Sequence, residues 1–138
     1  PFITTLPPKS TGRDLFNPSW LDKQLVGFES LLPKDIQATL TEFTAQACAS
    51  NVNQFAKQCQ TLIVCGGGAL NGQLMRRLQA ALPGLKVCRS DTFGLPPLQV
   101  EAAAFAWLAS KMIRRETASF KNVTGAQGPR ILGALYPA

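Results

Sequence analysis

The sequence has 138 residues, of which 46% are hydrophobic and 16% charged, and its formal net charge is +6. This length is enough for one domain with a hydrophobic core, and no apolar run approaches the ~20 residues that a membrane-spanning helix needs. The basic residues are scattered and histidine is absent, so we expect no nucleic-acid binding, no Cys/His zinc site and no histidine-dependent catalytic triad.

The first part of the chain predicts an extended, proline-rich start followed by short helical segments. Thr11 and Asp14 are spaced as in a capping box. Asn17 and Pro18 predict a helix that begins with a capping side chain and a proline at its first position. From Asp35 to about Phe55 the pattern is that of an amphipathic helix, with an expected inner stripe of Ile36, Leu40, Phe43 and Ala47.

Residues 61–115 alternate between strand-like and helix-like patterns. Strands are expected over 61–65 and 85–89, with a helix carrying leucines at 70, 74, 78 and 82 between them. A loop over 90–97 leads to a helix over 98–115, whose expected inner residues are Val100, Ala104, Trp107 and Leu108. This order predicts a βαβα unit and hence a parallel sheet. A glycine-rich loop over 122–129 and a terminal strand over 131–136 are expected to follow.

The cysteines do not form a C-x-x-C pair. Cys65 and Cys88 lie in the two strand-like runs, so we expect both to be small, buried, apolar side chains. Reduced thiols and a cytoplasmic location fit this pattern best.

Three consecutive glycines, Gly66, Gly67 and Gly68, follow the first predicted strand directly. In a parallel α/β unit, ligands bind beyond the carboxyl ends of the strands. One glycine would suffice for a tight turn, whereas three allow a flat ligand to lie against the backbone. The dinucleotide pattern G-x-G-x-x-G is only partly matched, since Asn71 replaces its third glycine, and the phosphate-binding pattern G-x-x-x-x-G-K-[ST] is absent. We therefore expect a backbone platform for a nucleoside, with the phosphates bound elsewhere.

Four segments, in order along the whole chain, resemble anhydro-N-acetylmuramic acid kinases. They are Pro7–Asn17, Cys65–Asn71, Glu101–Ala109, and Asn122–Ala126 with Ile131–Gly133. The resemblance implies a sugar kinase of the actin/hexokinase/heat-shock-70 ATPase superfamily. Enzymes of this superfamily have two ribonuclease-H-like lobes and bind ATP in the cleft between them. The implied reaction uses ATP and water to open the 1,6-anhydro ring and gives N-acetylmuramic acid 6-phosphate in peptidoglycan recycling.

The resemblance also implies which part of such an enzyme these residues form. They correspond to about the last third, an incomplete ribonuclease-H-like lobe that is mostly the nucleotide side, with about residues 122–138 crossing back to the other lobe. The family's phosphate loop and its Asp-Thr-Gly-type motif with the catalytic aspartate do not occur here. We therefore expect the N-terminal part of the same enzyme as a partner, a Mg²⁺ bound mainly by that part, no turnover by these residues alone, and a homodimer.

Several residues are candidates for contacts with ligands. By the resemblance, the glycine turn contacts adenosine, with Gly66, Gly67, Gly68, Ala69 and Asn71 as the candidate residues. Asn71 is expected to cap the helix that starts after it and could also contact the ribose. Glu101, at the start of the last predicted helix, matches a family glutamate and is expected to contact the sugar or the attacking water; a helix-end charge alone is the other interpretation.

Two further charged residues and two other functions remain open. Asp91 could bind Mg²⁺ or sugar, or only start a turn. Arg13 could bind a phosphate or carboxylate, or have a structural role. Other hypotheses for the chain are a non-catalytic nucleotide-binding lobe and a Rossmann-type domain for a dinucleotide or S-adenosylmethionine, because Asp91 follows the glycines at about the spacing that such a domain requires.

Overall fold

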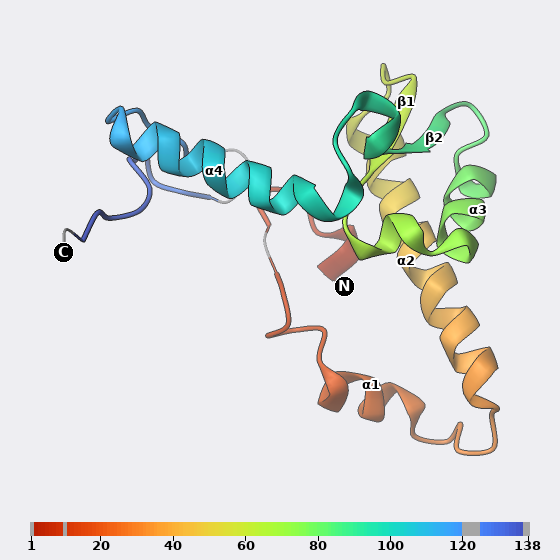
Figure 1. Ribbon diagram of the computed structural model, residues 1–138. Helices are drawn as coiled ribbons and strands as arrows, with labels where there is room; N and C mark the ends of the chain where they lie inside the picture. Colours follow the sequence, from red (N-terminus) through yellow and green to blue (C-terminus); the bar gives the residue numbers. More distant parts are fainter. Residues whose placement is uncertain (1, 10, 120–124, 137–138) are drawn as a thin grey trace. The chain divides into compact units, whose positions relative to one another are not determined.

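The computed structural model describes residues 2–9, 11–119 and 125–136, which form two compact units (Figure 1). We call Leu32–Ala104 the central unit, and Pro1–Leu31 with Phe105–Ala138 the terminal unit. The helix α4 (Val100–Ile113) begins in the first and continues into the second.

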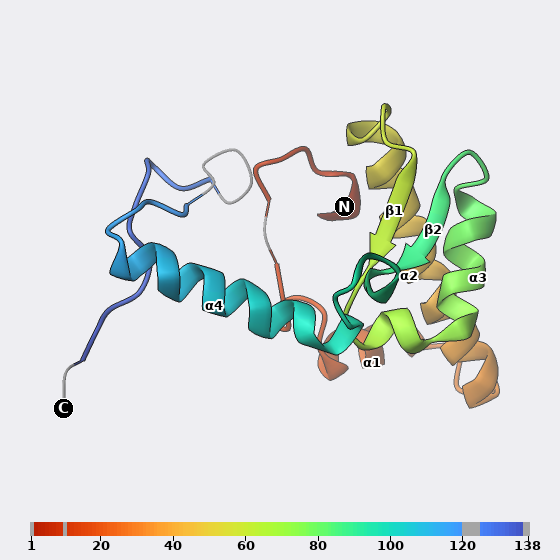
Figure 2. The ribbon, with the colours of Figure 1, turned by 45° about the horizontal axis from the view of Figure 1, so that its top comes forward.

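The central unit is built around two parallel strands, β1 (Thr61–Val64) and β2 (Lys86–Arg89), which pair from Thr61↔Lys86 to Val64↔Arg89 (Figure 2). The helix α3 (Gly72–Ala81) connects them. The predicted βαβα unit and parallel sheet are therefore confirmed. The remaining elements of the central unit are α2 (Pro33–Phe55) and the 3-10 helices η2 (Gly67–Leu70), η3 (Ser90–Phe93) and η4 (Pro97–Gln99).

The helices α2 and α3 pack against each other through small side chains on α2. Thr41, Ala45 and Ala49 are buried on α2, and Leu78 and Leu82 are buried at α3 and its end. The predicted inner stripe of α2 is therefore wrong, and Phe43 on that stripe is 42% exposed. Residues spaced by four lie on one face of a helix. The face with alanines packs inward because small side chains allow the neighbouring helix to approach closely.

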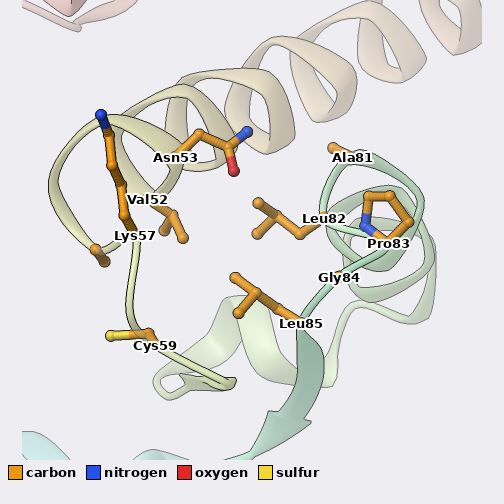
Figure 3. A pocket seen from close by; sticks show the side chains of 10 residues that line it. Val52, Asn53, Lys57, Cys59, Ala81, Leu82, Pro83, Gly84 and Leu85 are labelled. Carbon is orange, nitrogen blue, oxygen red and sulfur yellow. The ribbon is translucent and has the colours of Figure 1, made fainter.

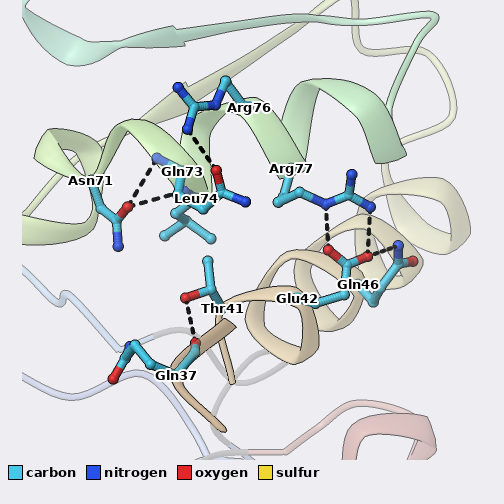
Figure 4. A network of polar contacts seen from close by, with 9 residues as sticks. All are labelled: Gln37, Thr41, Glu42, Gln46, Asn71, Gln73, Leu74, Arg76 and Arg77. Carbon is cyan, nitrogen blue, oxygen red and sulfur yellow. Dashed lines mark hydrogen bonds and ion pairs between the residues drawn. The ribbon is translucent and has the colours of Figure 1, made fainter. Parts of the chain in front are cut away.

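A polar contact also joins these two helices (Figure 4). The Arg77 guanidinium of α3 donates through Nε and Nη2 to the two carboxylate oxygens of Glu42 on α2, with Nη2–Oε1 at 3.0 Å. Gln46 Nε2 donates to the same carboxylate at 2.8 Å. The hydrogen bonds from Arg77, and secondarily from Gln46, lower the pKa of Glu42 to about 2.

Two expectations for the middle of the chain are wrong. Cys65 lies one residue beyond β1 and is exposed rather than buried, and Cys88 is half-buried. Leu70 belongs to η2 rather than to the following helix and is 52% exposed. The cause is Asn71, which starts α3 after Leu70 and so removes this leucine from the helical leucine series.

The terminal unit contains η1 (Phe2–Thr4), α1 (Pro18–Leu25) and most of α4. The predicted start of α1 is confirmed, because Asn17 Oδ1 accepts a hydrogen bond from Trp20 N at 2.9 Å and Pro18 is the first helical residue. The predicted capping box is wrong. Asp14 Oδ1 accepts from Gly12 N at 2.8 Å, and this contact closes a turn rather than starting a helix at Thr11.

The last part of the chain also departs from expectation. No residue of α4 is buried, and Trp107, predicted to face inward, is 46% exposed. Residues 131–136 form no strand, because no neighbouring strand pairs with them in the described part of the chain. Residues 122–124 of the predicted glycine-rich loop lie outside the described residues. None of the helices in residues 2–9, 11–119 and 125–136 combines the length and apolar character needed to cross a membrane.

Candidate functional site

The glycine turn, Gly66–Gly68, lies directly after β1, as the sequence predicts. Because β1 and β2 are parallel, their carboxyl ends lie at one edge of the sheet, and Asp91 follows β2 at this edge. The start of α4 is joined to it as well, since Gly66 N donates to Pro97 O at 2.9 Å and Pro97 begins η4, which leads into α4. The candidate site is therefore this carboxyl edge.

The three glycines have different structural roles. Gly66 has φ 73° and ψ −172°, a conformation essentially restricted to glycine. A side chain on Gly68 would place its Cβ 3.3 Å from Leu74 Cδ2, so this position is tight. A Cβ on Gly67 would meet no atom of the described residues within 4 Å, and its φ is not positive. Neither the backbone nor the packing of the described residues therefore requires glycine at Gly67.

The amino end of α3, which follows the glycine turn, is occupied by its own capping residue (Figure 4). Asn71 Oδ1 accepts hydrogen bonds from Gln73 N at 3.0 Å and Leu74 N at 3.1 Å. Asn71 O accepts from Met75 N at 3.0 Å. A phosphate bound at a helix N-terminus needs such N–H groups to be available. The N–H groups of Gln73 and Leu74 at the start of α3 are therefore already used by Asn71 and not offered to a phosphate.

A hollow of about 520 Å³ opens beside the glycine turn. This volume lies within the usual range of small-molecule sites. Apolar side chains of η2 and α3 line one part, and the end of β2 supplies charged and polar groups. The lining residues are Ala69, Leu70, Gly72, Met75, Val87, Cys88, Arg89, Asp91 and Thr92.

Asp91, a sequence-predicted candidate, is engaged with a neighbouring cation. Arg89 Nε donates to Asp91 Oδ1 at 3.2 Å, and Arg89 Nη2 forms an ion pair with Asp91 Oδ2. These hydrogen bonds hold the pKa of the Asp91 carboxyl below its usual range. Sequence reasoning did not identify Arg89. The signal available was the Arg-x-Asp spacing at the end of a predicted strand.

Glu101 and Arg13 occupy different parts of the chain. Glu101 is the second residue of α4 and is exposed, in the central unit with the glycine turn. Arg13 lies in an exposed turn of the terminal unit. Within the central unit, the structure thus gathers Gly66–Gly68, Asn71 and Asp91 at one edge and joins the start of α4 to it through Pro97.

A second hollow, of about 500 Å³, lies where the chain enters the two strands (Figure 3). Val52, Leu82 and Leu85 face one another across it, and Lys57 and Cys59 stand on the side that leads into β1. This is the amino edge of the sheet. Ligands of parallel sheets bind at the opposite, carboxyl edge, so this hollow is not the candidate site.

The described residues do not form a metal site. Within residues 2–9, 11–119 and 125–136, no three Cys, Asp or Glu side chains gather closely enough to hold a metal ion. Asp91, the candidate ligand, already pairs with Arg89. A magnesium ion bound only by these side chains does not fit this edge of the sheet.

Comparison with known proteins identifies the family. Residues 1–138 match the family model described as anhydro-N-acetylmuramic acid kinase. The chain belongs to the anhydro-N-acetylmuramic acid kinase family. The family match does not favour the hypothesis of a Rossmann-type domain or of a non-catalytic lobe, and the resemblance of the four sequence segments is confirmed.

Curated relatives named anhydro-N-acetylmuramic acid kinase cover the whole chain. The relative from Variovorax paradoxus is 58% identical over 138 residues, that from Albidiferax ferrireducens 60% over 138, and that from Ralstonia nicotianae 55% over 139. Each alignment covers 100% of this chain but only 36–37% of the length of the related kinase. It therefore spans little more than a third of the length of the family members that it matches.

Proposed function

We propose that this chain forms the adenosine-binding side of an ATP-dependent anhydro-N-acetylmuramic acid kinase. The whole enzyme uses ATP and water to open the 1,6-anhydro ring of the sugar and gives N-acetylmuramic acid 6-phosphate, a step of peptidoglycan recycling. The support is the family membership of the chain together with one observation at the carboxyl edge. Gly67 lacks a side chain although neither its backbone angles nor its neighbours require this.

The open space at Gly67 supports a flat ligand in contact with the backbone. A nucleoside meets this requirement, and Gly66, Gly68, Ala69 and Asn71 then form the rest of its platform. The hollow beside the turn has a volume that suits a base, with apolar side chains of η2 and α3 on one part of its wall and polar groups from the end of β2 on the other. Because Asn71 occupies the amino end of α3, we assign the phosphates to residues outside this chain.

Glu101 is proposed to face the sugar side of the reaction. A carboxylate at the start of α4 is exposed and is joined to the glycine turn through Pro97. Opening of an anhydro ether requires proton transfer to or from oxygen atoms, which carboxylates perform in enzymes. In this proposal Glu101 contacts the sugar or the attacking water. Asp91 holds Arg89 at the edge of the hollow, and Arg13 contacts a phosphate or carboxylate.

The remaining features of the whole enzyme follow from the family and are part of the same proposal. They are two ribonuclease-H-like lobes, with this chain mostly in the nucleotide-side lobe and about residues 122–138 crossing to the other, a homodimer, and a cytoplasmic location. ATP, when bound, supplies the phosphoryl group that the sugar receives. The magnesium ion and the catalytic aspartate are assigned to the rest of the enzyme.

Mass spectrometry of the reaction product tests the proposal. The full-length enzyme is incubated with ATP, Mg²⁺ and the 1,6-anhydro sugar, and ADP is measured in parallel. We expect one ADP for each sugar converted, and a product heavier by one water and one PO₃H group. A product heavier by PO₃H alone would contradict ring opening, and the absence of sugar-dependent ADP would contradict the kinase assignment.

A further inference from the structure

The helix α4 carries an apolar face that neither compact unit covers from within itself. Ala102, Phe105, Ala106, Ala109 and Ile113 follow the spacing i, i+3, i+4, i+7 and i+11, which places them on one side of a helix. All five are exposed, with Phe105 63% and Ile113 69% accessible. We call these five residues the bare face of α4.

Charge is absent from this face. The only ionisable side chains of α4 are Glu101 at its start and Lys111. At 100° per residue, Lys111 points to the side opposite the bare face. There it forms an ion pair with Glu116 and lies 5.4 Å from the centre of the Trp107 ring. The bare face is therefore suited to an apolar partner.

The chain's own C-terminal residues cover only one flank of the helix. Leu108 and Met112 are half-buried and line a hollow of about 330 Å³ together with Leu132, Gly133 and Ala134. Phe105 and Ala109 border this hollow but remain exposed. The described part of residues 125–136 therefore packs beside the bare face without covering it.

The composition of the face indicates close packing. Three alanines in five positions allow a neighbouring backbone to approach, and helices packed in this way lie about 8–10 Å apart. Phe105 and Ile113 supply the larger side chains that fill the remaining space. A contiguous exposed apolar patch on a helix marks an interaction surface.

We infer that, in the whole enzyme, the bare face of α4 is covered by the part of the same polypeptide that its relatives possess and this chain does not. The curated relatives are nearly three times as long as the aligned region, so ample chain exists for this contact. The position of Glu101 gives the second reason, and it rests on the proposed function. The groups that bind sugar and phosphate must meet Glu101, and Ala102 of the bare face is the next residue of the same helix.

Accessibility of an engineered cysteine in the full-length enzyme tests this contact. Ala109→Cys lies on the bare face, and Ala80→Cys lies on an exposed position of α3 as a matched control. Both changes add only one sulfur atom. The tryptic peptides Ser90–Lys111 and Leu78–Lys86 contain no native cysteine, so mass spectrometry can follow each site separately. Labelling by a maleimide is measured in the native and in the urea-unfolded enzyme.

We expect Ala109→Cys to react at least about tenfold more slowly in the native than in the unfolded enzyme, because labelling then needs local opening of the contact. Ala80→Cys should react at similar rates in both. Equal rates at position 109 would overturn the inference. Protection that is lost when a dimer is diluted to monomers would also overturn it, since a second copy would then be the occupant. The assay measures no turnover, so its failure is distinct from failure of the proposed function.

A second pair of variants measures the energetic consequence. Ala109→Glu introduces a charge into the proposed contact, whereas Ala80→Glu makes the same change on α3. We expect the first to lower the melting temperature by about 5 °C or more and the second to change it little. Equal melting temperatures for the two variants would contradict coverage of the bare face.

Discussion

At the scale of single residues, the three glycines of the turn lack a side chain for different reasons. Gly66 is required by its backbone angles, and at Gly68 a Cβ would lie in tight contact with the Leu74 side chain. Gly67 has neither constraint among the described residues, which leaves contact with a ligand as the physical reason that we propose. Gly67 is therefore the glycine of the turn at which a substitution tests ligand contact.

In the full-length enzyme, Gly67→Val should weaken ATP binding about tenfold or more, because a β-branched side chain would occupy the space of the nucleoside. The affinity for the sugar should remain nearly unchanged. Gly84→Val is the matched control, since a Cβ on Gly84 also meets no described atom within 4 Å but lies at the opposite edge of the sheet. Titration calorimetry with ATP and with the sugar provides both affinities. Unchanged ATP affinity in a folded Gly67→Val enzyme would contradict the platform role.

Glu101→Gln tests the proposed role on the sugar side. The amide keeps the size of the side chain but removes its negative charge. If the carboxylate contacts sugar or water during the reaction, kcat should fall by about 10² or more. A charge that only stabilises the helix end would change the melting temperature slightly and kcat little. Steady-state kinetics and a melting curve on the same sample distinguish the two roles, and near-normal kcat would show that Glu101 is structural.

At the scale of elements, the pair α2 and α3 supports the glycine turn, since α3 begins at Asn71 directly after it. The contact combines close packing of Ala45 and Ala49 with the bond from Arg77 to Glu42. A two-point contact between guanidinium and carboxylate fixes orientation better than a single hydrogen bond. Both ends of this ion pair are partly exposed, so its contribution to stability is expected to be small.

The contribution of Glu42 to stability should depend on pH. Its pKa is lowered to about 2 by Arg77, from about 4.3 in an unfolded chain. A depressed pKa stabilises the folded state above the unfolded pKa, and this contribution disappears as the pH falls from about 5 toward 2. The difference in melting temperature between the wild type and Glu42→Gln should therefore be largest near neutral pH and shrink on acidification.

Thermal unfolding of the full-length enzyme between pH 7 and pH 3 measures this difference. A double variant with Glu42→Arg and Arg77→Glu, which exchanges the partners, is the control and should recover part of the loss at neutral pH. A difference that stays constant over this range would show that the ion pair does not contribute through its charge.

At the scale of the whole molecule, we propose that the chain is the adenosine-binding side of a longer enzyme and that its site is incomplete by itself. The described residues gather no metal ligands, and the bare face of α4 is uncovered. The curated relatives are much longer than the region they share with this chain. Binding surface and catalytic groups are therefore expected to be divided between this region and the rest of the enzyme.

A polypeptide of these 138 residues alone should not phosphorylate the anhydro sugar, whereas the full-length enzyme should. A coupled assay for ADP, with and without the sugar, measures this difference at matched protein concentration. ADP release that depends on the sugar in the shorter polypeptide would show that the catalytic groups lie within these residues, and our division of the site would be wrong.

The sequence by itself determined the parallel βαβα order, the start of α1 and the position of the glycine turn. These features depend on local patterns such as hydrophobic periodicity, a capping asparagine before a proline, and glycines after a strand, all of which act over a few neighbouring residues. The four resembling segments also indicated the family, which comparison confirmed.

Only the tertiary structure decided which faces of the helices are buried and how the site is arranged. The inner side of α2 is set by the approach of α3 to small residues such as Ala45, which hydropathy alone ranks below Phe43. The pairing of Asp91 with Arg89 and the bond from Gly66 to Pro97 depend on chain segments that meet in space. Burial and pairing are properties of distant segments brought together, so periodicity along the sequence could not determine them.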